Sequence, residues 1–283
     1  MSRLLDLLLN GTAIEGLLLS IKHLTGLTQL NLRNCKSLLS LPDTICCLTS
    51  LTSLTLSGCS RLDKLPKKLG NLTGLSVLDV SETSIRELPS LEHLSNLTSL
   101  NLRDCKDLLS IPNTICNLTN IETLTLSGCS KLEDLPKNMG NLIGLKKLEM
   151  IGTAVREPPS SIFLIKNLEV LFFQGCEGAL SMRSPNPVHL ELPLSCLHSL
   201  VRLELRNCNL QAVPKNIDGL HLLENLNLCE NNFVCFPKSI IRLSKLKDIL
   251  RIAQVFDLCH NFHHLLTVFG QMVVPHWKHY LIN

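Results

Sequence analysis

Residues 27–35 read LTQLNLRNC and residues 97–105 read LTSLNLRDC, so the two stretches share the spacing LxxLxLxxC. Both belong to longer matches. NLRNCKSLLSLPDTIC from Asn31 aligns with NLRDCKDLLSIPNTIC from Asn101, and SGCSRLDKLPK from Ser57 aligns with SGCSKLEDLPK from Ser127. Both alignments have an offset of 70 residues. A block of three repeats has therefore been duplicated, and the repeat boundaries are boundaries of a structural unit.

The same phrase, often with Thr in place of Cys, recurs along most of the chain. Its starts are Leu4, Leu27, Leu51, Leu75, Leu97, Ile121, Leu145, Leu168, Leu200, Leu223 and Leu246. The successive spacings are 23, 24, 24, 22, 24, 24, 23, 32, 23 and 23 residues. The long spacing contains GCEGALSMRSPNPVHLELP, which ends at Pro193 and should form a loop outside the stack. This period and leucine pattern are typical of leucine-rich repeats.

Each repeat has the pattern of a strand, a turn and a helical return. Leu30 and Leu32 alternate with polar residues, which predicts a short strand with one buried face. The Cys, Thr or Asn after the strand can bond backbone groups that the turn frees. A Leu-Pro pair then ends strand pairing, because proline has no N–H. Ile45 and Leu48 have the three-residue spacing of a short helical turn.

These features predict an α/β fold, a right-handed, horseshoe-shaped solenoid of about 10 or 11 leucine-rich repeats over residues 1–250. The parallel β-sheet should line the concave face, with short helical or irregular segments on the convex face. Residues 251–283 depart from the repeat and are expected to form an atypical tail or a cap. The leucines of the first repeat, including Leu4, Leu7 and Leu9, should face solvent on one side, which indicates further structure upstream.

The composition favours neither nucleic acid nor a membrane as partner. The 27 Lys and Arg residues nearly balance the 24 Asp and Glu residues, so the net charge is +3. No apolar run approaches the roughly 18 residues that span a bilayer. The 13 cysteines are odd in number, and seven lie outside the repeated position, which favours a reducing compartment over a disulfide framework.

No residue pattern indicates catalysis, a metal or a cofactor. The cysteines at the repeated position are replaced freely by Thr and Asn, which are poor substitutes for thiolate ligands. We therefore expect these cysteines to be structural. The histidines near the C-terminus form no recognised metal-binding spacing with Cys259, and they are His260, His263, His264, His276 and His279. The chain is expected not to be an enzyme.

The C-x-x-L-x-x-L-P pattern occurs together with SGCS, LPxxIxxL, NGTAI at residues 10–14 and IGTAV at residues 151–155. This combination closely resembles the leucine-rich-repeat region of plant intracellular immune receptors, in the subclass that begins with a Toll-like domain and a nucleotide-binding ATPase domain. The resemblance covers roughly residues 1–250. It implies effector sensing and autoinhibition, in the cytoplasm or also in the nucleus. No GxxxxGK[ST] phosphate loop is present, so nucleotide binding is not carried over.

The resemblance implies a protein partner: a pathogen effector, a guarded host protein or the nucleotide-binding domain of the same receptor. Side chains that flank the inward leucines should face the concave side, where a ligand would bind. The later repeats combine charge with an aromatic residue, as interface anchors do. The rival interpretation is a solvated surface with charges that pair along the sheet. The candidate binding residues are Arg33, Arg103, Lys147, Glu149, Phe172, Gln174, Arg202, Glu204 and Arg206.

Two alternatives remain open at this point. An extracellular leucine-rich-repeat receptor or enzyme inhibitor would account for four glycosylation sequons, at Asn10, Asn71, Asn96 and Asn117, although three are variants of the phrase NLT. The chain could also be the substrate-binding part of a larger enzyme, which would require a catalytic domain elsewhere in the transcript.

Overall fold

The computed structural model describes residues 4–156, 158–174, 194–208, 210, 213, 216–231 and 237–250. The insertion at residues 175–193 and the tail at residues 251–283, with its histidines, lie outside the described residues.

One sheet contains all the strands of the described chain, and its eleven strands follow the order of the sequence. Each strand pairs in parallel with the next. The strands are β1 (Asp6–Leu8), β2 (Gln29–Asn31), β3 (Ser53–Thr55), β4 (Val77–Asp79), β5 (Ser99–Asn101), β6 (Thr123–Thr125), β7 (Lys147–Met150), β8 (Val170–Gln174), β9 (Arg202–Arg206), β10 (Asn225–Asn227) and β11 (Asp248–Leu250). We number the coils of the solenoid by these strands. The predicted parallel sheet is thus confirmed.

Short 3-10 helices form the return segments of the described coils, in place of α-helices. They are η1 (Leu19–His23), η2 (Asp43–Cys47), η3 (Leu69–Asn71), η4 (Asn113–Asn117), η5 (Met139–Asn141), η6 (Ser160–Leu164), η7 (Leu194–Cys196), η8 (Ile217–Gly219) and η9 (Lys238–Arg242). Four of the five-residue helices begin directly after a proline, whose fixed φ suits a helix start. The repeat that contains β4 is the shortest, with 22 residues, and its return segment contains no helix.

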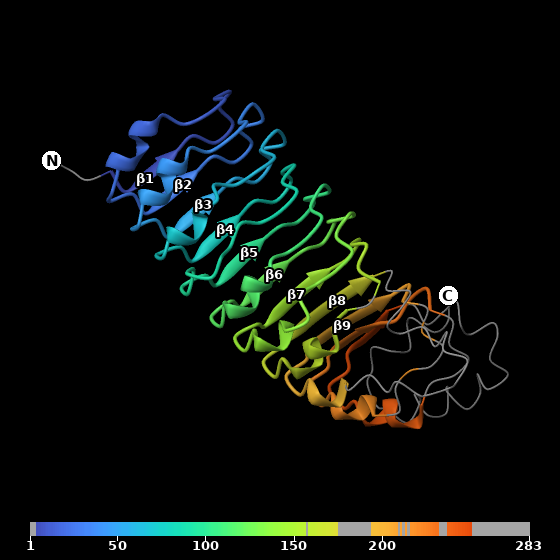
Figure 1. Cartoon of the computed structure of the whole chain (residues 1–283). Coiled ribbons are helices and arrows are strands. Elements are labelled where there is room, and N and C mark those ends of the chain that lie inside the picture. The colour runs from blue at the N-terminus through green and yellow to red at the C-terminus, as the bar shows by residue number, and fades with distance from the viewer. Residues whose placement is uncertain are drawn as a thin grey trace.

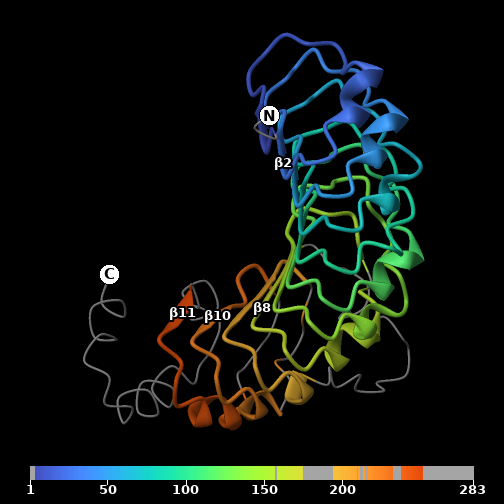
Figure 2. The ribbon, with the colours of Figure 1, turned by 90° about the vertical axis from the view of Figure 1, so that its left-hand side faces the viewer.

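The coils stack along one axis in sequence order (Figure 1). The stack bends into an arc, with the strands on its inner side and the 3-10 helices on its outer side (Figure 2). The candidate binding residues on the strands therefore belong to the concave face. No helix among the described residues is long and apolar enough to cross a membrane.

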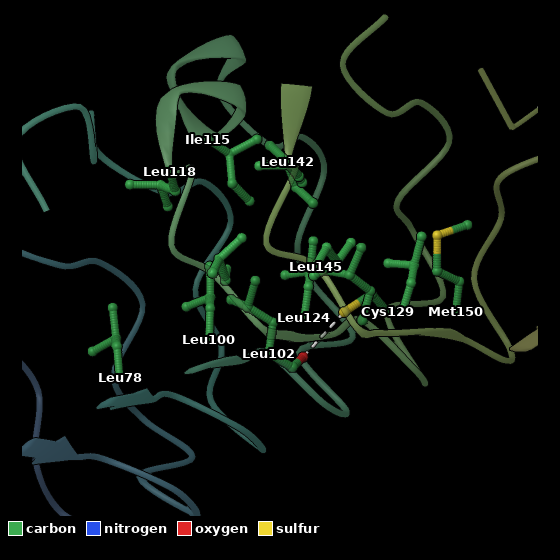
Figure 3. Close-up of a cluster of buried hydrophobic side chains, with 14 of the residues drawn as sticks. Leu78, Leu100, Leu102, Ile115, Leu118, Leu124, Cys129, Leu142, Leu145 and Met150 are labelled. Atoms are coloured by element: carbon green, nitrogen blue, oxygen red, sulfur yellow. Dashed lines mark hydrogen bonds between the residues drawn. The ribbon is translucent and has the colours of Figure 1, made fainter. Parts of the chain in front are cut away.

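A single continuous core of leucine and other apolar side chains runs through the stack. Leu78, Leu100 and Leu124 occupy the same strand position in successive coils and are fully buried. Figure 3 shows these strand side chains together with Ile115 and Leu118 of a return segment, which belong to the same core. Because each coil buries its apolar face against its neighbours, the stability of one coil depends on stacking, as the sequence predicted.

Candidate functional site

The concave face has its longest strands at β7, β8 and β9, with four, five and five residues against three in every other strand. Their register places Glu149 beside Phe172 and Phe172 beside Glu204. Gln174 lies beside Arg206 at the far end of the same strands. Five of the seven candidate residues of the later coils are thus beside another candidate in the register, whereas Lys147 and Arg202 both stand beside Val170. We call the seven residues the β7–β9 patch, and they are Lys147, Glu149, Phe172, Gln174, Arg202, Glu204 and Arg206.

Phe172 occupies the centre of the β7–β9 patch. Its ring is half-buried on the concave side, whereas its neighbour Phe173 points into the core and is 2% exposed. On one side Lys147 forms an ion pair with Glu149, with 2.9 Å between Nζ and Oε1. The Glu149 side chain is only 15% exposed, so this carboxylate is held against the sheet rather than projecting into solvent. Those two charges already neutralise each other before any partner binds.

The two arginines of β9 have different surroundings. Arg206 forms an ion pair with Glu230 of coil 10. That contact raises the pKa of Arg206 and lowers the pKa of Glu230, mainly through the side-chain hydrogen bond. The Arg202 side chain is exposed and forms no hydrogen bond or ion pair with a described residue, although its charge helps to lower the pKa of Glu224. Arg202 is therefore the more available of the two for a carboxylate on a partner.

Arg33 and Arg103 are exposed on the concave face but lie in coils 2 and 5, outside the β7–β9 patch. The Arg103 side chain approaches Asp104, with 3.6 Å between Nε and Oδ2. Ser57 and Ser81 occupy the corresponding positions of coils 3 and 4, just after the strands, and both are buried. The structure thus separates these two candidates from the other seven.

Polar residues at the ends of several strands hold the turn instead of facing a ligand. The side-chain Oδ1 of Asn31 accepts a hydrogen bond from the Arg33 backbone N–H at 3.0 Å. Asn101 does the same for Arg103 at 3.1 Å. Asp79 and Asn227 make equivalent bonds to the second residue after them. Sequence analysis did not identify this role, although an Asx residue two positions before a turn is a known signal for it.

A left-handed residue stands directly before the repeated Cys, Thr or Asn. The non-glycine members have φ between 50° and 61° and are Asn34, Glu82, Asp104, Asn207 and Glu230. The glycine members are Gly11, Gly58, Gly128 and Gly152. Glycine, Asn and Asp tolerate this conformation better than other residues, which explains the dipeptides NC, DC, GC and GT in the repeats. These dipeptides were the sequence signal that sequence analysis missed.

Four of the repeated cysteines donate to the preceding coil, which confirms their structural role, whereas Cys208 donates to the Arg206 carbonyl oxygen of its own coil. Cys129 Sγ donates to the carbonyl oxygen of Leu102 at 3.1 Å, as the dashed line in Figure 3 shows. Cys35, Cys59 and Cys105 make the same bond to the coil before them. Burial raises the pKa of Cys59 to about 11 and that of Cys129 to about 12, so both remain neutral thiols at physiological pH and can donate.

Where Thr or Asn stands at this position instead of cysteine, its side chain also donates a hydrogen bond to a backbone carbonyl oxygen. Thr83 Oγ1 donates to the carbonyl oxygen of Val80 within its own coil at 2.7 Å. Asn231 donates to Leu228 in its own coil and to Leu205 in the preceding coil. Within the described part of the chain, no group of three His, Cys, Asp or Glu side chains has the geometry of a metal site.

Comparison with known proteins agrees with this architecture. A family model described as a leucine-rich repeat region matches residues 54–157. The solved structure of the leucine-rich-repeat protein LIC12759 of Leptospira interrogans matches 82% of this chain and 68% of its own chain, with a TM-score of 0.57 and 24% sequence identity. That likeness supports the solenoid fold.

Among curated relatives, TMV resistance protein N of Nicotiana glutinosa is 36% identical over 187 residues, which is 62% of this chain and 16% of that protein. Disease resistance-like protein DSC1 of Arabidopsis thaliana is 37% identical over 166 residues, 58% of this chain and 13% of that protein. The chain therefore spans about a sixth or less of the length of these relatives. The chain thus has the leucine-rich-repeat solenoid fold, and its sequence is similar to parts of these plant disease resistance proteins.

Proposed function

We propose that this chain is a non-enzymatic protein-recognition module of a plant disease resistance receptor, and that the β7–β9 patch on its concave face contacts the partner. The observation that carries the proposal is the half-buried Phe172 ring, which the register places between Glu149 and Glu204. Strand β7 begins with a lysine, and β9 begins and ends with an arginine. An aromatic anchor surrounded by polar groups is a common centre of protein interfaces. The nearly neutral net charge argues against nucleic acid and membranes as partners.

The partner classes that fit are a pathogen effector, a guarded host protein and the nucleotide-binding domain of the same receptor. Each would present a folded protein surface to the concave sheet. We place the module in the cytoplasm, with the nucleus as a second compartment, because the buried cysteine thiols require no oxidising environment.

The test compares partner capture by four forms of the chain, using cross-linking and mass spectrometry in plant cell extract. Phe172→Ala and Arg202→Glu should each lose the partners that the unchanged chain retains. Arg33→Glu is the matched control, because Arg33 is also an exposed concave arginine and lies outside the β7–β9 patch. Retention of every partner by Phe172→Ala and Arg202→Glu, or an equal loss with Arg33→Glu, would refute the assignment of the patch.

One observation favours a second candidate, an extracellular receptor or enzyme inhibitor. The asparagines of three sequons, Asn10, Asn71 and Asn117, are exposed, whereas Asn96 donates through Nδ2 to the carbonyl oxygen of Thr73 at 2.9 Å. A glycan could attach to the first three without disturbing a coil contact. Glycan occupancy at Asn71 and Asn117 in the protein purified from plant cells would favour this candidate over the cytoplasmic one.

A further inference from the structure

The aromatic ring of Phe172 has a carboxylate on each side. Strand β8 lies on the inner side of the arc (Figure 2), and parallel pairing puts Glu149 of β7 and Glu204 of β9 directly beside Phe172. All three side chains are half-buried on the concave face. Neighbouring strands lie about 4.8 Å apart, so both carboxyl groups are within reach of a group that rests on the ring. The face of a phenyl ring and a carboxylate both attract a cation.

The two carboxylates are not equally available to such a cation. Glu149 already forms an ion pair with Lys147. The Glu204 side chain, in contrast, forms no hydrogen bond or ion pair with a described residue. Its neighbour in the register on the other side is Asn227 of β10, whose Oδ1 accepts from the Cys229 backbone N–H. A half-buried carboxylate without a partner has lost part of its hydration, and a cation supplied by a binding partner would compensate for that loss.

The two arginines of β9 do not neutralise Glu204. The charge of Glu204 contributes to the raised pKa of Arg206, but the largest cause of that shift is the side-chain hydrogen bond from Arg206 to Glu230 of coil 10. Arg202 helps to lower the pKa of Glu224, which also belongs to coil 10. Both arginines thus interact with carboxylates of coil 10, and the Glu204 carboxylate remains available to a cation that rests on Phe172.

Building on the proposed function of the β7–β9 patch, we infer that the protein partner places an arginine side chain on Phe172, with its guanidinium bonded to Glu204. Arginine fits this site better than lysine, because a planar guanidinium stacks on an aromatic ring and offers paired N–H donors to a carboxylate. The apolar stem of the arginine would pack on Val170, the half-buried residue that shares the concave side of β8 with Phe172.

Arg202 distinguishes this partner from a polybasic segment. Arg202 stands two residues before Glu204 on the same face of β9, which is about 6.6 Å along the strand. A second cation next to the bound arginine would approach Arg202 and be repelled, whereas a carboxylate at that place would be attracted. The surface of the partner should therefore combine one arginine with a neighbouring acidic residue, in charge complementarity to Glu204 and Arg202.

Nuclear magnetic resonance titration of the full chain, with isotope labels in the phenylalanine rings, tests the inference. The probes are N-acetylarginine amide and N-acetylcitrulline amide, which have nearly the same shape but differ in charge. The Phe172 signal is identified by its loss in Phe172→Leu. At matched ionic strength, the arginine probe should shift this signal with an affinity roughly 5-fold or more above that of the citrulline probe. N-acetyllysine amide should bind more weakly than the arginine probe.

Glu204→Gln should remove most of the preference for arginine over citrulline, because it keeps the size of the side chain and removes its charge. Glu133→Gln is the matched control, since Glu133 is an exposed glutamate outside the sheet and its loss should leave the preference unchanged. Circular dichroism confirms that each variant is folded.

The inference is overturned by equal binding of the arginine and citrulline probes, by equal binding of the arginine and lysine probes, or by the lack of any shift at Phe172. A preference for arginine that survives Glu204→Gln, or that is lost in Glu133→Gln, would also overturn it. These failures are distinct from failure of the proposed function. If Phe172→Ala loses its captured partners but the probes bind alike, the β7–β9 patch remains the docking face and only the arginine is rejected. If capture is unchanged while the arginine probe binds selectively, the patch is rejected as the docking face.

Discussion

The Asn34 side chain lies directly over Gly58 of the next coil. A Cβ atom built on Gly58 would stand 2.2 Å from Asn34 Oδ1, and Gly58 itself has φ of +74°. Asp104 covers Gly128 in the same way in the duplicated block, with 2.1 Å between Oδ1 and a Cβ on the glycine. A glycine in one coil thus makes room for the turn residue of the coil before it.

Gly58→Ala should therefore destabilise the solenoid for two reasons, a left-handed φ and a clash with Asn34. The left-handed backbone conformation alone destabilises the folded state with alanine by about 1–2 kcal/mol. Gly11→Ala separates the two causes, because Gly11 has φ of +72° but no atom within 4 Å of its would-be Cβ. We expect Gly58→Ala to lower the urea midpoint clearly more than Gly11→Ala. Equal shifts would show that the contact with Asn34 relaxes without cost.

Glu82→Gly should stabilise the chain. Glu82 is exposed and has φ of 56°, a conformation that glycine adopts without the steric penalty of a Cβ. The gain should be about 1 kcal/mol, reduced by the greater freedom of glycine in the unfolded chain. Glu133→Gly removes the same charge from an exposed residue without positive φ and should not stabilise. Urea denaturation of both variants measures the difference, and a gain in both would point to charge rather than to φ.

Asn231→Ala should be one of the most damaging polar substitutions in the described chain. Asn231 Nδ2 donates to the carbonyl oxygens of Leu205 and Leu228, while its Oδ1 accepts from the backbone N–H groups of Cys208 and Leu210. The residue is 8% exposed, so water cannot easily replace these bonds. We expect a loss of at least ~3 kcal/mol.

Thr153→Ala is the comparison for Asn231→Ala. Thr153 occupies the equivalent position, and its Oγ1 donates one hydrogen bond of this kind, to the Met150 carbonyl oxygen at 3.1 Å. Its loss should be about 1 kcal/mol. Thermal unfolding of both variants tests the ratio. A similar loss in both would mean that the number of bonds at this position does not determine its contribution.

The buried cysteines should make the solenoid less stable at alkaline pH. Burial raises the pKa of Cys59 to about 11 and of Cys129 to about 12, above the value of 9.0 for an exposed thiol. Above pH 9 the unfolded chain therefore loses these protons first, and the stability that is fully present below pH 9 declines as the pH rises towards 11 or 12. The decline for each thiol is at most about 1.4 kcal/mol per pH unit.

Urea midpoints measured between pH 8 and pH 11 test this effect. Cys129→Thr is the matched variant, because threonine occupies the same position in other coils and does not titrate there. We expect the midpoint of Cys129→Thr to fall less steeply with pH than that of the unchanged chain. Parallel curves would show that the thiol of Cys129 does not contribute to the alkaline loss.

Much of the fold follows from the sequence because the repeat is short and its signals are local. Alternating leucines predict a strand, proline predicts its end, and the period of 22 to 24 residues predicts the stack, all without any contact between distant residues. The order of the strands and the inward leucine rows were predicted on this basis. The turn residues were also readable in principle, since Asn, Asp and Gly precede the repeated Cys or Thr in most coils.

The pairing of charges was not readable, because it depends on which side chains the register brings together. In the sequence, Arg202 and Arg206 are equivalent members of one strand. Only the stacked coils show that Arg206 pairs with Glu230, while the Arg202 side chain forms no ion pair with a described residue. The sequence by itself determined a solenoid with a polar concave face, through local periodicity. Tertiary structure decided which concave charges are already neutralised, because the Arg206–Glu230 pair exists only where one coil stacks on the next.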